Sequence, residues 1–128
     1  MPGASPLVRR GLLQVTTTTE IGRAGEGRAR RYYEALGYEV VAANVRVARV
    51  ELDLVVRRGN ELLFVEVKVK RGDDYGDPLE MVDARKLRRL RRAAETWLAI
   101  RPADRALDVA IEVIALRPTG IERVRDTG

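Results

Sequence analysis

The hydrophobic pattern of this 128-residue chain changes its period at Gly37, and that change restricts the folds open to it. Before Gly37, apolar or small residues recur at helical spacing, at Ile21, Gly25, Ala29, Tyr32 and Leu36. We expect a helix there, with Thr18 or Thr19 as its N-cap and Gly37 as its stop signal.

After Gly37, apolar and polar residues alternate with a period of two, which predicts strands. The alternation covers three runs, at residues 38–47, 50–57 and 61–69. The short Arg-Arg-Gly-Asn turn at residues 57–60 predicts that the last two runs form a hairpin.

A helical pattern returns at residues 77–100, where Asp77 is the expected N-cap and Pro78 suits the first helical position. Its expected buried stripe is Leu79, Val82, Leu87, Leu90, Ala94 and Trp97. Residues 107–116 are nearly all apolar and predict a central strand, and residues 121–124 predict a short edge strand.

The predicted order is therefore α-β-β-β-α-β with one more strand at the end. It indicates an α/β domain with a mixed sheet and helices packed on the sheet. The length suits one domain, which we assign to residues 18–128, and residues 1–17 are expected to form a flexible extension.

The chain contains neither cysteine nor histidine. This excludes disulfides, zinc sites built on thiolate or imidazole, and mechanisms that use either group. A catalytic metal would have only oxygen ligands, which favours Mg²⁺ or Mn²⁺. The longest apolar runs are strand-sized and no apolar secretory stretch opens the chain, so we expect a cytoplasmic protein without a membrane partner.

A formal net charge of +5 suits a polyanionic partner, of which nucleic acid is the commonest, although charge also keeps small proteins soluble. Much of the positive charge falls on the second predicted helix, where no acid interrupts Arg85, Lys86, Arg88, Arg89, Arg91 and Arg92. Like charges at helical spacing destabilise a helix by a few tenths of a kcal/mol per pair. An anionic partner explains the cluster, and a solvated helix face is the alternative.

Asp53, Glu66 and Lys68 are the residues from which we expect chemistry. Glu66 and Lys68 share a strand face, and the hairpin brings Asp53 toward Glu66 if the register is favourable. Both carboxylates and the backbone carbonyl of Val67 could hold a divalent cation for phosphodiester hydrolysis. Lys68 would orient or deprotonate the attacking water, or stabilise charge on the phosphate. The alternative is a set of cross-strand salt bridges, worth about 0.2–1 kcal/mol each.

Glu26 is a further candidate, at the edge of the expected buried stripe of the first helix. Gly22 and Gly25 beside it would let the backbone approach another element closely. An acid there could contact the metal directly or through water. The alternative is an ordinary exposed glutamate that pairs with Arg30 four residues later.

Ordered motifs run through most of the chain. They are Gly22, Gly25-Glu26, Ala29, Leu36-Gly37-Tyr38, Asn44-x-Arg46, Glu51-Leu52-Asp53-Leu54-Val55, Leu63-Phe64-Val65-Glu66-Val67-Lys68, Tyr75-Gly76-Asp77-Pro78-Leu79-Glu80, Lys86 and Asp108-Val109. With this spacing the chain resembles the bacterial YraN-like family, an uncharacterised family of predicted endonucleases, over roughly residues 22–125.

The resemblance implies the restriction-endonuclease-like fold of the PD-(D/E)xK superfamily. By that similarity Asp53, Glu66 and Lys68 fall on the catalytic motif, and Glu26 falls on the acidic position of the helix. The layout is also similar to that of archaeal Holliday junction resolvases, which brings branched DNA into consideration as a substrate.

The chain departs from the family pattern at three places. Val50 stands where glycine is usual, Lys70 stands where arginine is usual, and Ala106-Leu107-Asp108 replaces Arg-Phe-Asp. None of these changes touches the expected metal ligands.

Three functions follow as hypotheses. The first is a Mg²⁺- or Mn²⁺-dependent nuclease, for which DNA is favoured over RNA as the substrate and structured or branched DNA is one candidate. Its phosphate contacts would come from Arg46, Lys70, Arg85, Lys86, Arg88, Arg89 and Arg92. The second is a non-catalytic nucleic-acid-binding module that keeps the nuclease fold, and the third is a protein-interaction domain with an acidic partner. A homodimer would let such a small nuclease reach both strands.

Overall fold

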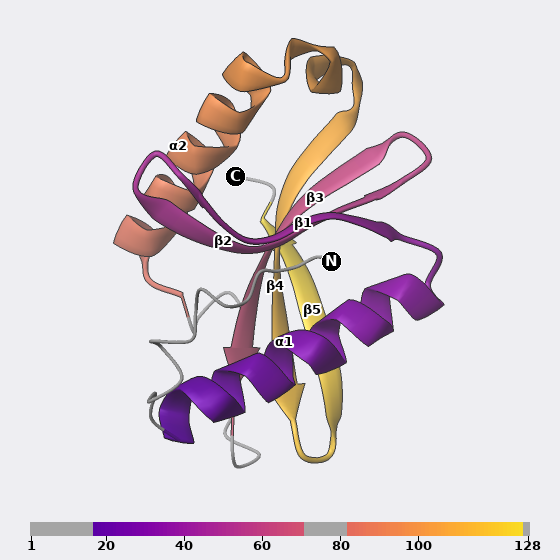
Figure 1. Cartoon of the computed structure of the whole chain (residues 1–128), viewed down its shortest axis with the longest axis vertical. Helices are drawn as coiled ribbons and strands as arrows, with labels where there is room; N and C mark the ends of the chain where they lie inside the picture. Colours follow the sequence, from indigo (N-terminus) through magenta and orange to yellow (C-terminus); the bar gives the residue numbers. More distant parts are fainter. Residues whose placement is uncertain (1–16, 71–81, 127–128) are drawn as a thin grey trace, which may run out of the picture.

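The computed structural model describes residues 17–70 and 82–126 of the chain, with side chains from residue 23 onward. Helix α1 (Thr17–Ala35) is followed by strands β1 (Glu39–Val47), β2 (Val50–Arg58) and β3 (Glu61–Val69). Helix α2 (Ala84–Ile100) and the short 3-10 helix η3 (Pro102–Ala106) lead to β4 (Asp108–Arg117) and β5 (Gly120–Asp126) (Figure 1).

The five strands form one sheet in the order β1-β2-β3-β4-β5. Strands β1, β2 and β3 are antiparallel neighbours, β3 pairs with β4 in parallel, and β5 returns antiparallel along β4. The predicted mixed sheet and the core order α-β-β-β-α-β are confirmed, and with them the restriction-endonuclease-like fold. The predicted edge strand at residues 121–124 is longer than expected.

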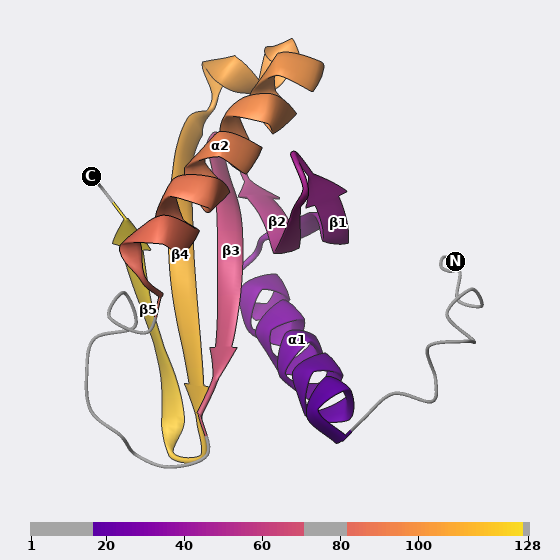
Figure 2. The same ribbon diagram turned by 90° about the vertical axis from the view of Figure 1, so that its left-hand side faces the viewer.

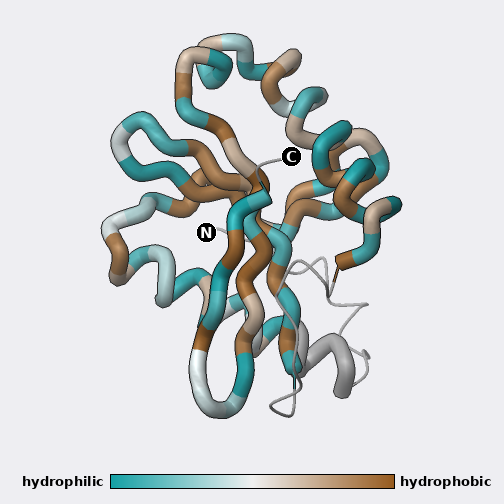
Figure 3. The backbone as a smooth tube through the Cα atoms, turned by 180° about the vertical axis from the view of Figure 1, so that it is seen from behind, coloured by the Kyte–Doolittle hydropathy of each residue, from teal (hydrophilic) through white to brown (hydrophobic). Residues whose placement is uncertain are grey.

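Both faces of the sheet are buried, each under one helix (Figure 2). On one face Trp97 of α2 packs edge-to-face against Phe64 of β3, with ring centroids 5.8 Å apart. On the other face Tyr33 of α1 packs in a cluster with Val65. Burial on both sides explains why the central strands are largely apolar, and Figure 3 shows long brown stretches, interrupted by teal, where the strands cross. Neither described helix is both long and apolar enough to span a membrane.

Helix α1 contacts the sheet through Gly25, Ala29 and Tyr33, which follow one another at four-residue steps. The predicted stripe is wrong at Leu36, which is 37% exposed, whereas Tyr32 is half-buried and packs against the core cluster that contains the fully buried Tyr33. Adjacent tyrosines carry the same hydrophobic signal, so the pattern cannot choose between Tyr32 and Tyr33. The structure buries Tyr33, whose hydroxyl donates a 2.6 Å hydrogen bond to the buried Glu112 of β4.

The end of α1 follows the prediction, and its start does not. Gly37 has a φ of 93°, and its N–H donates to the Glu34 carbonyl at 2.9 Å, as in helix C-caps that favour glycine. At the other end Thr18 and Thr19 are helical, so neither is the N-cap. Each threonine in the run is an equally suitable N-cap, so the sequence does not indicate at which one the helix begins. Apart from Thr17, the predicted extension lies outside the described residues.

Helix α2 begins at Ala84, with Asp83 as its N-cap, and the Asp83 carboxylate accepts a 2.8 Å hydrogen bond from the Lys86 N–H. A continuous helix from Asp77 is wrong, because Val82 and Asp83 are not helical. The sequence offers both Asp77 and Asp83 as N-caps. The burial of Val82 in the core, directly before Asp83, favours Asp83. Asp77, Pro78 and Leu79 themselves lie outside the described residues. The rest of the predicted stripe is confirmed, with Leu87 half-buried and Leu90, Ala94 and Trp97 buried.

Candidate active site

Strands β2 and β3 separate beyond the pair Leu54–Val65, and this separation forms a fork in the sheet (Figure 1). Before the fork the two strands pair regularly from the hairpin turn onward. Beyond it β2 remains paired with β1 as far as Val50, while β3 remains paired with β4 through Val69. The edge of β3 that faces β2 therefore has no strand partner beyond Val65.

Asp53 lies on β2 at the first position of the fork. Its Oδ2 accepts a 2.8 Å hydrogen bond from the backbone N–H of Val67 on β3, so a carboxylate takes the place of a strand's carbonyl. In a strand the N–H and C=O of one residue point toward the same edge. The carbonyl of Val67 consequently points into the fork, beside the Asp53 carboxylate.

Glu66 precedes Val67 and is only 5% exposed. Burial, followed by the negative charge of Asp53, raises the pKa of Glu66 to about 7. Glu112 is equally buried but accepts hydrogen bonds from the Tyr33 hydroxyl and from Arg123 and Arg125. Among the described residues Glu66 has only lysine ammonium groups at ion-pair distance. Its charge is therefore much less well compensated than that of Glu112.

Two lysines approach the same oxygen of Glu66. Lys68 Nζ lies 4.0 Å from Glu66 Oε2, so Lys68 is also at the fork. Lys86 Nζ lies closer, at 3.7 Å, although the sequence analysis assigned Lys86 to phosphate contacts on the basic helix face. Helical geometry explains this position, because Lys86 precedes the buried Leu90 by four residues and Ala93 by seven, and so shares their sheet-facing stripe.

Asp53 has the same electrostatic character as Glu66. Its pKa is raised mainly by burial and further by the charge of Glu51, while the Val67 N–H and the two lysines act in the opposite direction. Two neighbouring carboxyl groups that both resist ionisation indicate a local shortage of positive charge. A bound cation would remove that shortage.

Glu26 reaches the same region from α1, on the opposite face of the sheet from α2. Burial raises the pKa of Glu26, a hydrogen bond with the Asn44 side chain lowers it, and the charges of Asp53 and Glu51 raise it. Glu26 is thus within electrostatic range of Asp53. The alternative partner, Arg30, pairs instead with Glu34, at 3.5 Å.

Asn44 occupies an unusual backbone position on β1. The pairs Ala43–Leu54 and Val45–Leu52 flank it, which puts it opposite Asp53 in the register. Its φ of 52° lies in the left-handed region, where asparagine is one of the few tolerated non-glycine residues. This local turn of the strand accompanies the hydrogen bond between Asn44 and Glu26.

The oxygen ligands at the fork are few, and they fit Mg²⁺ better than an ion such as Ca²⁺ that needs many ligands. The described residues hold no group of three or more acidic side chains close enough together to bind a metal ion. Asp53, Glu66 and the Val67 carbonyl supply two carboxylates and one carbonyl. Mg²⁺ is commonly held by one or two carboxylates and keeps several waters, whereas Ca²⁺ takes six to eight oxygen ligands.

The remaining predicted phosphate contacts lie on the surface. Those on α2 are exposed and make no ion pair with any described residue; they are Arg85, Arg88, Arg89 and Arg92, called here the arginine face. Arg91, on the same helix, is engaged in a 2.7 Å ion pair with Asp126 of β5. Arg46 is exposed on β1 opposite Glu51, and Lys70 follows β3 half-buried, with its N–H bonded to the Leu116 carbonyl.

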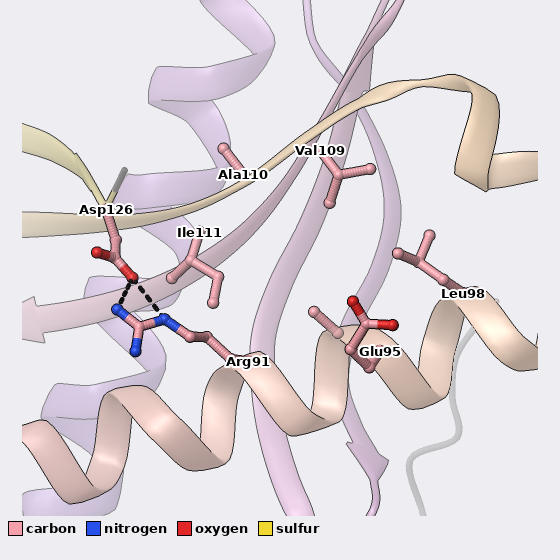
Figure 4. A pocket seen from close by; sticks show the side chains of 8 residues that line it. Arg91, Glu95, Leu98, Val109, Ala110, Ile111 and Asp126 are labelled. Carbon is pink, nitrogen blue, oxygen red and sulfur yellow. Dashed lines mark hydrogen bonds and ion pairs between the residues drawn. The ribbon is translucent and has the colours of Figure 1, made fainter. Parts of the chain in front are cut away.

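A pocket of about 250 Å³ lies elsewhere, between α2 and the beginning of β4. Figure 4 shows Leu98, Val109 and Ile111 in its wall and the Arg91–Asp126 ion pair at one end. None of the candidate catalytic residues lines this pocket. The candidate catalytic residues at the fork therefore lie outside this pocket.

Sequence reasoning missed three neighbours of the site. Lys86 was detectable, because it falls on the same helical stripe as Leu90 and Trp97. Glu51 has the period-two relation to Asp53 that indicates a shared face, but only the structure shows its effect on the pKa of Asp53. Asn44 belongs to one of the family-like motifs, but the sequence does not reveal its role, which depends on the strand's local backbone turn.

Comparison with known proteins identifies relatives over most of the chain. The sequence profile of the uncharacterised protein family UPF0102 matches residues 25–116. A UPF0102 protein of Beutenbergia cavernae is 45% identical over 113 residues, covering 84% of this chain and 95% of its own length. One from Symbiobacterium thermophilum is 48% identical over 79 residues, covering 62% of this chain and 67% of its own length. One from Syntrophotalea carbinolica is 43% identical over 102 residues, covering 80% and 82%.

UPF0102 is the YraN-like family that the sequence motifs resemble, and the matched region contains the fork and both helical contributors to it, Glu26 and Lys86. The chain belongs to the UPF0102 family.

Proposed function

We propose that this protein is a divalent-metal-dependent nuclease that hydrolyses phosphodiester bonds in DNA. The observation that carries the proposal is the fork, where Asp53 is held at 2.8 Å by the Val67 N–H beside the buried Glu66. Burial disfavours the ionised form of both carboxylates, and added positive charge would stabilise it. A divalent cation held there would polarise a phosphate and lower the pKa of a water molecule.

The other residues at the fork have roles that follow from their positions. Lys68 shares the strand face of Glu66, where its ammonium orients the attacking water or stabilises charge that develops on the phosphate. Glu26 is held by Asn44 on the α1 side and assists as an outer acidic contact to the ion or its water. We assign no direct role in bond cleavage to Asn44.

The arginine face of α2 supports a nucleic acid as the substrate. Its exposed guanidinium groups make no close ion pair with a described residue, although the charges of Arg85 and Arg89 lower the pKa of the exposed Asp83, and they belong to the same helix that brings Lys86 to Glu66. A phosphate backbone laid along this face would extend toward the fork. DNA is the favoured substrate, with structured or branched DNA included, and Arg46 and Lys70 would add phosphate contacts.

The test is incubation of purified protein with linear, nicked and four-way DNA, with Mn²⁺ or Mg²⁺ and with EDTA. We expect cleavage by the wild type only with a divalent ion, and none by Lys68→Met, whose side chain has a similar length but no charge. DNA binding at low salt is measured in parallel and is expected to survive in Lys68→Met. Absence of cleavage with both ions on all three substrates, or wild-type cleavage by Lys68→Met, would contradict the proposal.

A second candidate function is nucleic-acid binding without catalysis, which the arginine face favours by itself. It predicts salt-dependent binding of the same substrates and no cleavage with either ion. A homodimer would place two forks on one duplex. Sedimentation of the protein with and without DNA tests that arrangement.

A further inference from the structure

Oε2 of Glu66 is shared by two ammonium groups that come from different elements. Lys68 is two residues away on the same strand, at 4.0 Å, whereas Lys86 is presented by the first turn of α2, at 3.7 Å. The charge of Lys86 also lowers the pKa of Asp53, and its effect exceeds that of Lys68. Lys86 therefore acts on both carboxylates of the fork from outside the hairpin that carries them.

The side chain of Lys86 is about one-third exposed, while the side chain of Glu66 is almost fully buried. Its ammonium lies 3.7 Å from Glu66 Oε2, a long contact for a lysine–carboxylate pair, and a lysine stem is unbranched and flexible. No carboxylate other than those of the fork engages Lys86 among the described residues. The ammonium is thus held only by the carboxylates of the fork, at the end of a flexible stem, and can move.

We propose, on the basis of the proposed function, that Lys86 is a built-in competitor of the metal ion. Its ammonium supplies positive charge to Glu66 while the fork holds no divalent ion. Binding of the ion repels the ammonium, because a cation between Asp53 and Glu66 takes over their negative charge. The released ammonium then binds a phosphate of the DNA, next to the arginine face on the same helix.

This arrangement couples metal binding to DNA binding. A phosphate that accepts the ammonium of Lys86 removes the competitor, so DNA strengthens metal binding. Metal binding must strengthen DNA binding by the same factor, since coupling between two ligands is reciprocal. The fork would bind its ion weakly without substrate and more tightly with it.

The first test measures Mn²⁺ binding by electron paramagnetic resonance, without DNA, for the wild type, Lys86→Gln, Lys86→Arg and Arg91→Gln. Lys86→Gln is expected to bind Mn²⁺ roughly three- to tenfold more tightly, the range for loss of a partly exposed charge near a carboxylate. Lys86→Arg keeps the charge and is expected to stay near the wild type. Arg91→Gln removes one charge from the same helix at its Asp126 ion pair and is expected to leave the affinity unchanged.

The second test adds a short DNA duplex in a Lys68→Met background, which the proposed function expects not to cleave. Duplex DNA is expected to tighten Mn²⁺ binding severalfold when Lys86 is present, and distinctly less when Lys86→Gln is added. An equal effect of DNA in both variants would show that Lys86 does not transmit the coupling.

The outcomes separate this inference from the proposed function. If the wild type binds Mn²⁺ through Asp53 but Lys86→Gln binds it no more tightly, the competitor role is wrong and the nuclease proposal stands. If neither the wild type nor Lys86→Gln binds Mn²⁺, both proposals fall. Thermal unfolding of each variant in EDTA verifies that the compared proteins are folded.

Discussion

Gly25 of α1 packs directly against the side chain of Val69, the last residue of β3. A methyl group added at Gly25 would overlap the Val69 side chain, and Leu116 lies 3.6 Å from the same point. The neighbours of the two contacting residues are Glu26 and Lys68, so this contact fixes how α1 approaches the fork. The close approach depends on glycine for lack of a side chain, since α1 has ordinary helical backbone there.

Gly25→Ala is therefore expected to destabilise the protein by about 1–3 kcal/mol, the usual range for overpacking against a stiff branched side chain. Gly27→Ala is the matched control, because only the flexible Arg31 side chain lies near it, at 3.5 Å. That control is expected to stabilise α1 by roughly 0.5–1 kcal/mol. Urea denaturation checks both values, and the double variant Gly25→Ala/Val69→Ala should recover part of the loss. Equal stability of the two alanine variants would contradict the packing argument.

Substitution of Asp53 separates its structural role from its metal-binding role. Asp53→Asn retains an oxygen that can accept the Val67 N–H and removes a buried charge, so at neutral pH without metal it should be at least as stable as the wild type. Asp53→Ala leaves that N–H without its partner and should cost about 1–3 kcal/mol. Both variants should lose Mn²⁺ binding and cleavage. Mn²⁺ binding by Asp53→Asn at wild-type affinity would exclude Asp53 as a ligand.

Glu66→Gln is expected to stabilise the metal-free protein at alkaline pH. The pKa of Glu66 is raised from 4.5 to about 7 in the fold, so the unfolded chain ionises first as pH rises. Stability from this group is present below about pH 4.5 and is lost as pH rises through about 7. At pH 8 in EDTA the variant should exceed the wild type by roughly 1–3 kcal/mol, and the difference should vanish near pH 4.5. A variant less stable than the wild type at pH 8 would contradict the uncompensated burial of Glu66.

The arginine face is expected to set the salt dependence of DNA binding. Arg89→Gln and Arg92→Gln should each reduce the slope of log affinity against log salt by about 0.9 if each residue contacts one phosphate. Arg91→Gln is the control, since Arg91 is engaged with Asp126. Fluorescence anisotropy of labelled duplex over a range of salt gives the slopes. Equal losses in all three variants would mean that bulk charge, and not this face, binds the DNA.

The fold was predictable because its signals are local and repeated. Period-two runs predict β1, β2 and β3 within one residue at each end, and Gly37 marks the end of α1. The start of α2 was not predictable, because Asp77 and Asp83 are both chemically suitable caps. The choice depends on the burial of Val82, which is a tertiary property.

The candidate site was predictable in composition and not in geometry. Spacing alone puts Glu66 beside Lys68, but the approach of Asp53 depends on the separation of β2 from β3 after Leu54. At that separation the Asp53 carboxylate accepts the Val67 N–H in place of a strand carbonyl, and the period-two pattern does not indicate such a replacement. Glu26 and Lys86 reach the site from helices on opposite faces of the sheet. The residue pattern of a single strand cannot predict such contacts.

The most direct measurement of the central claim is a crystal soaked in Mn²⁺ and examined by anomalous diffraction. The account predicts one ion in the fork, about 2.0–2.3 Å from a carboxylate oxygen of Asp53, a carboxylate oxygen of Glu66 and the carbonyl of Val67. It also predicts that Lys86 Nζ lies farther from Glu66 than its 3.7 Å without metal. A saturating soak with no ion at the fork, or with the ion bound only elsewhere, would contradict it.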